Sequence, residues 1–227
     1  MLKAVTLNVW NRSGMWPERL RLITRELAEL APDVVGLQEV MRLYEPGREP
    51  SAPQDQTAEI ASELGYAIAY APAADYGNGL VMGNAILSRF PIIASSSEPL
   101  PHAGTGEPRS LGYARLRTEW GELPVFVTHF NWRFEHGFAR LAQAVPVAAR
   151  GGPGTTYDPR NDYARTNREP ARRIDYIFVR GPDEKLRGEP LRTKIVFNEP
   201  QEGPEGLVWP SDHFGVYSEI AVEPRSL

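Results

Sequence analysis

The chain has 227 residues, 41% of them hydrophobic, and its 25 Lys and Arg stand against 29 Asp and Glu for a formal net charge of −4. This charge balance excludes an overall positive field that would hold long nucleic acid non-specifically. The absence of cysteine excludes disulfides, thiolate metal sites and a cysteine nucleophile, and no apolar run is long enough to cross a membrane.

The first residues bear on the location of the protein. They read MLKAVTLNVWNR and contain neither the apolar core nor the cleavage site of a signal peptide. Together with the lack of cysteine, this predicts a cytoplasmic protein that does not insert into a membrane. Length and composition fit a single domain over residues 1–227, and we expect a monomer.

Strand-like and helical segments alternate in the first part of the chain. Residues 4–10 predict a strand, and Pro17 suits the first turn of a helix whose apolar residues share one face. A short buried strand is predicted at 33–40. Helical spacing at 54–65 predicts a helix that ends at Gly65.

Strands dominate the rest of the chain, separated by Gly and Pro. Short apolar strands of this kind suit two sheets that are buried against each other, so the chain is predicted to be a layered α+β sandwich. These strands are predicted at 66–72, 83–89, 111–118, 123–130, 172–179, 192–197 and 213–222.

Six polar side chains stand inside or at the ends of the predicted strands. A buried carboxylate is costly unless it is hydrogen-bonded, paired or bound to a metal ion. Oxygen donors from Asn8, Glu39 and Asp212 suit Mg²⁺ or Mn²⁺, which takes few protein oxygens and keeps waters that a phosphate can replace. The six residues are Asn8, Glu39, His129, Asp175, Asp212 and His213.

Each of these residues also has a purely structural interpretation. A lone strand-end glutamate such as Glu39 is more often a surface or capping carboxylate than a ligand, and Asn8 fits a satisfied buried amide. Asp175 and Arg173 fit a structural ion pair. The order and spacing of the motifs that contain these residues favour a functional role.

Six segments, taken in order, make the chain resemble the endonuclease/exonuclease/phosphatase family, which has the fold of DNase I and of the inositol-polyphosphate 5-phosphatases. The resemblance runs from end to end. It implies a four-layer sandwich, two β-sheets flanked by helices, with a cleft at one edge where a phosphate ester is cleaved with Mg²⁺. The segments are TLNVWN (6–11), DVVGLQEV (33–40), GNAILSRFPI (83–92), FVTHFN (126–131), RRIDYIFV (172–179) and PSDHFGV (210–216).

The resemblance implies a role for each matched residue. Asn8, Glu39 and Asp212 are the expected metal ligands, and His213 is expected beside the scissile phosphate. Asp175 is expected to hydrogen-bond to His213 and orient it, as an acid–imidazole pair does in hydrolases generally.

Further residues are expected to contact the substrate. His129 matches a second family histidine that contacts the phosphate. Arg89, Trp132 and Arg173 are the other candidate substrate-binding residues, although Arg89 suits a role in holding its own loop better than contact with phosphate. Water attack in line on phosphorus is then favoured by the metal and the two imidazoles, which stabilise charge on the phosphoryl oxygens.

One family motif, Gly-Asp-X-Asn, is missing from the sequence. No aspartate begins Asp-X-Asn after an apolar strand, and DPRN at 158–161 has two residues between its Asp and its Asn. We therefore expect an internal deletion near 145–151 that removes one central strand and lowers stability and activity. A natural deletion, a defective gene model and another segment that fills the gap are three explanations that stay open.

Two functions stay open as well. The first is a divalent-metal-dependent hydrolase of phosphate esters, a phosphodiesterase, nuclease or phosphomonoesterase, favoured because the six site residues are all present. The second is a catalytically impaired pseudoenzyme that binds metal or phosphate ligands, favoured by the missing Asp-X-Asn. The substrate class, nucleic acid, nucleotide or small phosphoester, depends on loops that the sequence does not interpret.

Overall fold

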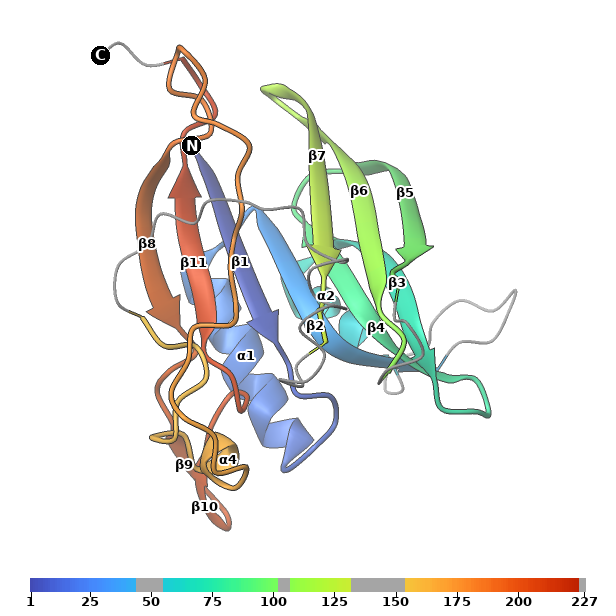
Figure 1. The fold of residues 1–227 in the computed structure, drawn as a ribbon, viewed down its shortest axis with the longest axis vertical. Coiled ribbons are helices and arrows are strands. Elements are labelled where there is room, and N and C mark those ends of the chain that lie inside the picture. Colours follow the sequence, from blue (N-terminus) through green and yellow to red (C-terminus); the bar gives the residue numbers. More distant parts are fainter. Residues whose placement is uncertain (44–54, 102–106, 132–153, 225–227) are drawn as a thin grey trace.

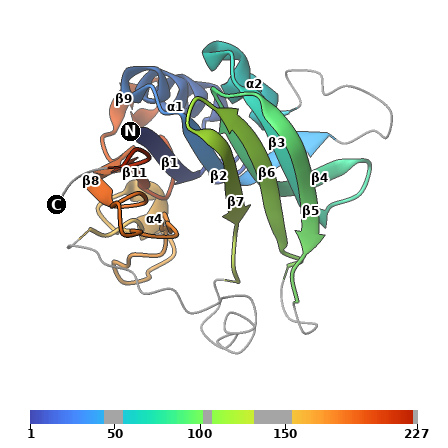
Figure 2. The same cartoon turned by 90° about the horizontal axis from the view of Figure 1, so that it is seen from above.

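The computed structural model describes residues 1–43, 55–101, 107–131 and 154–224. Two β-sheets pack on each other, and two helices cover the outer face of the larger sheet (Figure 1). A view turned by 90° shows the smaller sheet on the side of the larger sheet that faces away from these helices (Figure 2). The predicted α+β sandwich of two sheets is therefore confirmed.

The larger sheet has six strands in the order β3-β4-β2-β1-β11-β8. β1 and β2 are parallel at its centre, and the other neighbours are antiparallel. Its central strands are buried on both faces, which explains their near-continuous apolar sequences. The strands are β1 (Leu2–Asn8), β2 (Val34–Leu43), β3 (Ala67–Asp75), β4 (Leu80–Ser88), β8 (Pro190–Val196) and β11 (Gly215–Ile220).

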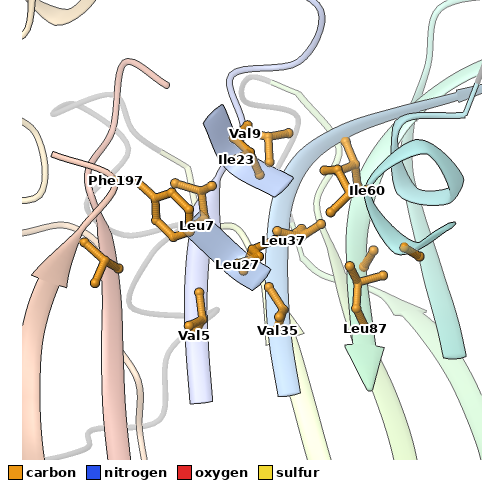
Figure 3. Packing of buried hydrophobic residues seen from close by; sticks show 14 of the residues in the cluster. Val5, Leu7, Val9, Ile23, Leu27, Val35, Leu37, Ile60, Leu87 and Phe197 are labelled. Atoms are coloured by element: carbon orange, nitrogen blue, oxygen red, sulfur yellow. The ribbon is translucent and has the colours of Figure 1, made fainter. Parts of the chain in front are cut away.

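The two helices that cover this sheet begin in different ways, and only α2 has a side-chain N-cap. α1 (Trp16–Leu30) has Pro17 in its first turn, where a missing N–H costs nothing. α2 (Gln56–Leu64) begins after Asp55, whose carboxylate caps the helix, and ends at Gly65 in the left-handed conformation. Figure 3 shows the side chains buried between helices and sheet, and each contributes about 1.5–3 kcal/mol. They include Val5, Leu7, Ile23, Leu27, Val35, Leu37, Ile60 and Leu87.

The smaller sheet has three strands, β5 (Ile92–Pro99), β6 (Ser110–Thr118) and β7 (Gly121–Thr128), in the order β5-β6-β7. A second apolar cluster joins it to the larger sheet, because alternate residues of each strand point to opposite faces. β5 was not predicted, since its middle reads Ala-Ser-Ser-Ser and lacks an apolar pattern. The cluster includes Leu2, Val34, Ala69, Ile86, Ala114, Leu116 and Val127.

The predicted strand at 172–179 is wrong. Its side chains alternate between partly buried and exposed, as in a strand: Ile177 packs on the second cluster and Phe178 is 52% exposed. The segment nevertheless forms no strand ladder. Only Arg172 makes an isolated bridge, to Tyr157. The physical reason is the lack of a neighbour: over the ranges given above, the smaller sheet ends at β7, so no adjacent strand supplies the ladder hydrogen bonds.

Three layers of the predicted four-layer sandwich lie within the described residues. Among the residues that the structure describes, α1 and α2 pack on the larger sheet, and no helix lies over the outer face of β5, β6 and β7 (Figure 1). The expected deletion near 145–151 lies outside the described residues. None of the helices within those residues is long and apolar enough to cross a membrane.

Three short elements complete the fold. One is the helix α4 (Asp162–Arg165), and the other two, β9 (Gln201–Gly203) and β10 (Gly206–Val208), form a hairpin. α4 lies in the loop that connects the 154–161 region to the 172–179 segment. The 154–161 region packs beside the start of β11, through a bridge between Tyr157 and His213.

Candidate active site

The strand register brings the polar ends of three neighbouring strands to one edge of the larger sheet. β1 and β2 are parallel, with Asn8 beside Gln38, so both strands reach this edge with their carboxyl ends. β11 is antiparallel to β1 and starts at the same edge, just after Asp212 and His213. Residues from both ends of the chain therefore meet because the topology aligns these strand ends.

A bulge in β2 turns Glu39 toward this edge. The register of β2 with β4 shifts between Leu37 and Val40, and Glu39 has a left-handed φ of 57°. Asn8 Nδ2 donates to Glu39 Oε1 at 3.0 Å, and Asn11 Nδ2 donates to Glu39 Oε2 at 3.4 Å. Both carboxylate oxygens are thus held by amides. Asn11 is not among the residues predicted above; its signal is a second asparagine three positions after Asn8.

Ser211 connects the loop that carries Asp212 to the end of β1. Its hydroxyl donates to the backbone oxygen of Asn8 at 2.6 Å and lies 3.3 Å from Asp212 Oδ1. Burial raises the pKa of Asp212 to about 6, and Glu39 adds to this effect while neighbouring cations oppose it. Two carboxylates therefore lie at the same edge beside the positive charges of His213 and Arg19, and the remaining cost of burying the Asp212 charge is one that a bound cation would lower.

Arg19 lies beneath the same edge and is fully buried. Its guanidinium donates to backbone oxygens of Val9, Ser13 and Pro210, at 2.6 Å to Ser13 and 3.1 Å to Pro210. Burial lowers its pKa to about 10, and the charge of Asp212 opposes this. Arg19 therefore joins the loop after β1 to the loop before β11. The sequence signal for it is an arginine on the buried face of a helix.

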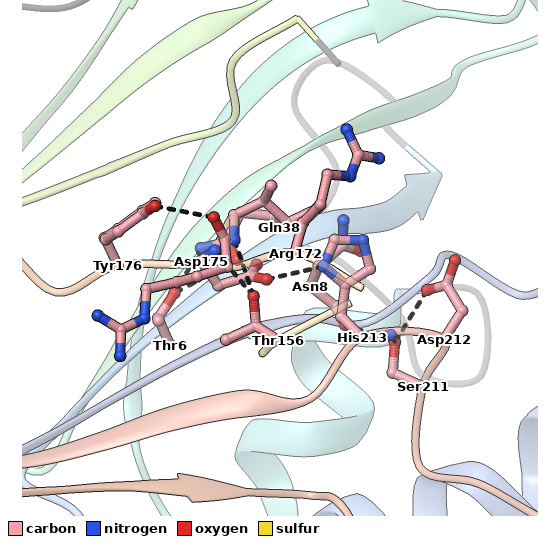
Figure 4. A network of polar contacts seen from close by, with 12 residues as sticks. Thr6, Asn8, Gln38, Thr156, Arg172, Asp175, Tyr176, Ser211, Asp212 and His213 are labelled. Carbon is pink, nitrogen blue, oxygen red and sulfur yellow. Dashed lines mark hydrogen bonds and ion pairs between the residues drawn. The ribbon is translucent and has the colours of Figure 1, made fainter. Parts of the chain in front are cut away.

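The pair that His213 forms with Asp175 is the best-defined contact of the site (Figure 4). The distance between His213 Nδ1 and Asp175 Oδ2 is 2.9 Å, and both side chains are about nine-tenths buried. Burial alone lowers the pKa of His213, but Asp175, Asp212 and Glu39 outweigh it and raise this pKa to about 9. His213 is therefore protonated at neutral pH in the metal-free protein.

His129, at the end of β7, is held in the opposite protonation state. Its Nδ1 lies 3.0 Å from Arg109 Nη1, and because a guanidinium only donates, this nitrogen must be an acceptor. Burial, Arg109 and His213 hold the pKa of His129 well below its usual range. The neutral ring then carries its proton on Nε2, which lies 3.9 Å from Glu39 Oε1. Two imidazoles with separated pKa values are typical of acid–base sites.

Arg109 is the residue that the sequence-based prediction missed most clearly. Its side chain is 3% exposed, just before β6, and it lines a pocket together with Glu39, Asn84 and His129. Its Nε has no hydrogen-bond partner among the described residues, although a second nitrogen reaches Glu107 at 3.5 Å. Arg109 thus places a buried positive charge beside Glu39 and His129. No strand pattern marked it, since it precedes β6 in a Pro-containing loop.

Arg89 is not brought to this edge. It forms an ion pair with Asp33, which directly precedes β2, whereas Glu39 stands in the middle of that strand. About six residues of extended chain, roughly 20 Å, separate Asp33 from Glu39. The structure thus shows Arg89 holding its own loop against the start of β2, and its contact with substrate stays a prediction.

The two other predicted substrate contacts have different outcomes. Arg173 lies two residues before Asp175 and donates its Nε to the backbone oxygen of Gly154 at 3.1 Å. It is therefore near the His213 side of the site, and its contact with substrate stays a prediction. Trp132 lies outside the described residues.

The DPRN segment uses its side chains within its own neighbourhood. Asp158 accepts hydrogen bonds from Thr155 Oγ1 at 2.7 Å and from the backbone of Arg160 at 2.9 Å, and the pair with Arg160 lowers its pKa to about 2. Asn161 donates to the backbone oxygen of Ser211 at 2.7 Å. Asp158 is therefore a stably ionised loop residue, and Asn161 is a support for the loop that carries Asp212.

Comparison with solved structures identifies the fold. The match to the endonuclease/exonuclease/phosphatase family protein of Leptotrichia buccalis has a TM-score of 0.64 at 17% identity and covers 97% of this chain and 99% of that one. A member from Beutenbergia cavernae gives 0.60 at 21% identity, over 97% and 71% of the chains. D. rerio TDP2 complexed with a single-strand DNA product gives 0.64 at 16% identity, over 96% and 97%.

A search of curated proteins gives no match. The sequence model of the Endonuclease/Exonuclease/phosphatase family, in contrast, matches residues 5–213, a range that begins in β1 and ends at His213. The match thus includes every residue that the structure gathers at the edge described above. The chain therefore belongs to the endonuclease/exonuclease/phosphatase family.

Proposed function

We propose that the protein is a divalent-metal-dependent hydrolase of phosphate esters that uses water attack on phosphorus. The observation that carries this proposal is a pair of histidines at the edge that Glu39 occupies, one bonded to a carboxylate and the other to a guanidinium. The Asp175 carboxylate helps to raise the pKa of His213 to about 9, whereas burial and the Arg109 guanidinium lower the pKa of His129. A binding module has no need to separate the two imidazoles in this way.

The donor set at the edge fits Mg²⁺ or Mn²⁺. Asn8, Glu39 and Asp212 offer only oxygen ligands, and the raised pKa of Asp212 reflects the cost of burying its charge, to which Glu39 adds. Among the residues that the structure describes, no three His, Cys, Asp or Glu side chains form a group that could hold a metal ion by themselves, so the proposed site uses two carboxylates and the amide of Asn8. A hard cation that keeps several waters suits such an open set. When bound, it would supply Lewis-acid stabilisation of the phosphoryl oxygens.

The protein's own groups have separate tasks in this proposal. The protonated His213 stabilises charge that develops on the phosphoryl group, and Asp175 holds its ring in place. His129 presents its Nε2 proton to the same region, because Arg109 occupies its other nitrogen. Arg109 itself adds a positive charge at the pocket that Glu39 lines. Positioning and electrostatics therefore supply most of the catalysis.

A single-stranded nucleic acid is the substrate class that we favour. The D. rerio TDP2 structure of the same fold is complexed with a single-strand DNA product. The net charge of −4 disfavours tight, non-specific binding of a long duplex, whereas a short strand needs few phosphate contacts. Nucleotides and small phosphoesters are the alternatives within the same chemistry.

The second candidate function is a pseudoenzyme that binds metal or phosphate ligands. One observation favours it: the sequence lacks the Asp-X-Asn that the family uses at the nucleophile, and Asp158 is engaged in its own loop. The two candidates share the metal site, so binding alone does not separate them.

Turnover is the measurement that separates the two functions. We expect wild-type protein to hydrolyse bis-p-nitrophenyl phosphate with Mg²⁺ or Mn²⁺ and to lose this activity in EDTA. His213→Ala should lower the rate by about 100-fold or more, because it removes a positioned acid. Glu63→Gln, a change on the exposed surface of α2, is the control and should leave the rate unchanged. Folded wild-type protein without turnover would favour the pseudoenzyme.

A further inference from the structure

The segment that carries Asp175 has an unusual means of support. Residues 172–179 belong to no strand ladder in the described parts of the chain, so their backbone amides need other partners. The amides of Ile174 and Asp175 both donate to one atom, Thr156 Oγ1, at 3.0 Å and 3.1 Å (Figure 4). Thr156 is fully buried. One side-chain hydroxyl thus accepts the hydrogen bonds that a neighbouring strand would otherwise accept.

The backbone of Thr156 also bonds to the chain next to His213, the partner of Asp175. The amide of Phe214 donates to the backbone oxygen of Thr156 at 2.6 Å, directly after His213 in the chain. The Thr156 amide in turn donates to the backbone oxygen of Arg172 at 2.9 Å. Thr156 therefore lies between the two segments that carry Asp175 and His213, and it is bonded to both.

The next residue supports the imidazole ring itself. Tyr157 forms isolated bridges with both Arg172 and His213, and its ring meets the His213 ring edge-on at a centroid distance of 5.2 Å. Its hydroxyl accepts from Asn167 Nδ2 at 2.7 Å, which fixes the ring orientation. The Thr156–Tyr157 dipeptide is thus a rigid connection between the acid and the imidazole of the pair.

We propose that Thr156 is a positioning residue for the Asp175–His213 pair, and that its hydroxyl sets the place of the Asp175 carboxylate opposite His213 Nδ1. The proposal rests on the proposed function for its effect on turnover, but not for its effect on the pair. Without the hydroxyl, the amides of Ile174 and Asp175 lose this shared acceptor, and the packing of neighbouring side chains is left to hold the Asp175 backbone. A shift of about 1 Å in a catalytic group is enough to cost about 100-fold in rate.

The test compares substitutions that differ only in the hydroxyl. Thr156→Val keeps the shape of the side chain and removes the acceptor, whereas Thr156→Ser keeps the acceptor and removes a methyl group. Thr118→Val is the matched control, because Thr118 Oγ1 also accepts a backbone amide, from Trp120 at 3.1 Å, in the turn between β6 and β7. Thr118 is at the opposite end of β6 from Arg109 and the site.

The first readout does not depend on activity. We expect the His213 Nδ1 proton to give a downfield nuclear magnetic resonance signal in wild-type protein at a fixed pH, assigned by its loss in His213→Gln. Thr156→Val should abolish or broaden this signal, and Thr156→Ser and Thr118→Val should retain it. An unchanged signal in Thr156→Val would overturn the proposal even if the wild-type protein proves inactive.

The second readout is kinetic. In Thr156→Val, kcat should fall about 10- to 100-fold while KM stays within about twofold, and Thr156→Ser should recover most of kcat. Equal losses of kcat in Thr156→Val and Thr118→Val would overturn the proposal, because they would reflect stability alone. If Thr156→Val does not fold, Thr156→Ala is compared with Thr156→Ser instead. Loss of the signal or of kcat in Thr156→Ser as well as in Thr156→Ala would then overturn the proposal. If the wild-type protein is inactive but the signal is lost in Thr156→Val and kept in Thr156→Ser and Thr118→Val, the proposed hydrolase function is refuted and the positioning role of Thr156 stands.

Discussion

At the scale of single residues, the site is governed by how neighbours set protonation. The same side-chain type is charged at position 213 and neutral at position 129, because the His213 ring donates to a carboxylate whereas the buried His129 ring accepts from a guanidinium. Asp212 completes this pattern, since burial beside Glu39 raises the pKa of its carboxyl to about 6. A pKa that differs between the folded and the unfolded state also makes the free energy of unfolding depend on pH.

The first prediction concerns pH. The folded-state pKa of His213 is raised to about 9, against about 6.5 for an unfolded histidine. A raised pKa contributes stability that is complete below pH 6.5 and is lost as the pH rises through 9. We therefore expect the free energy of unfolding of the metal-free protein to fall by up to about 3 kcal/mol between pH 6.5 and 9. Urea denaturation in EDTA measures this fall.

The control for the pH prediction is His213→Gln, which removes the titrating group. Its free energy of unfolding should change much less over the same pH interval. An equally large fall in this variant would show that other groups cause the pH dependence.

The second prediction concerns Asp212. At pH 7 its carboxylate is ionised against the cost of burial, so Asp212→Asn should stabilise the metal-free protein by about 1–3 kcal/mol. The same change should abolish the stabilisation that Mg²⁺ gives to wild-type protein. Urea denaturation in EDTA and in Mg²⁺ measures both effects, with Glu63→Gln as control. A variant less stable than wild type in EDTA would contradict the prediction.

At the scale of elements, the side chains of the 172–179 segment alternate between two faces as in a strand, but its backbone forms no ladder of hydrogen bonds with a strand in the described residues. Ile177 faces the second apolar cluster, and Ile174 is 39% exposed on the other side. Tyr176 and Phe178 stack on this outer side at a centroid distance of 5.5 Å. Side-chain burial, rather than backbone pairing, therefore places the segment, and Thr156 adds the backbone support.

This interpretation predicts unequal effects of one substitution on the two faces. Ile177→Ala should lower the free energy of unfolding by about 1–2 kcal/mol, because it removes methyl groups from partly buried packing. Ile174→Ala, the matched control three residues earlier, should lower it by less than 1 kcal/mol. Urea denaturation compares the two, and equal losses would show that the segment packs in another way.

At the scale of the whole molecule, topology explains how the site is assembled. The parallel pair of β1 and β2 and the antiparallel β11 deliver Asn8, Glu39 and Asp212 to one sheet edge. β7 brings His129 from the smaller sheet, since the second apolar cluster joins the two sheets. The site therefore depends on both sheets, and each supplies one of the two histidines.

The sequence by itself determined most elements and the identity of the gathered residues. Apolar periodicity gave α1, α2 and the strands of the larger sheet, because each buries a face whose spacing is local information. The six polar residues were visible because polar groups at strand ends are unusual. Their gathering at one edge was implied by the family resemblance, and the roles of these residues stay predictions.

Tertiary structure alone decided the rest, for a common physical reason: partners distant in sequence set the outcome. The 172–179 segment has strand-like residues but no neighbouring strand, so it forms no ladder. Arg109 and Thr156 act through groups that are distant in the chain, and no local pattern marks them. The same holds for protonation, since His129 and His213 differ only in the groups that the fold places beside them.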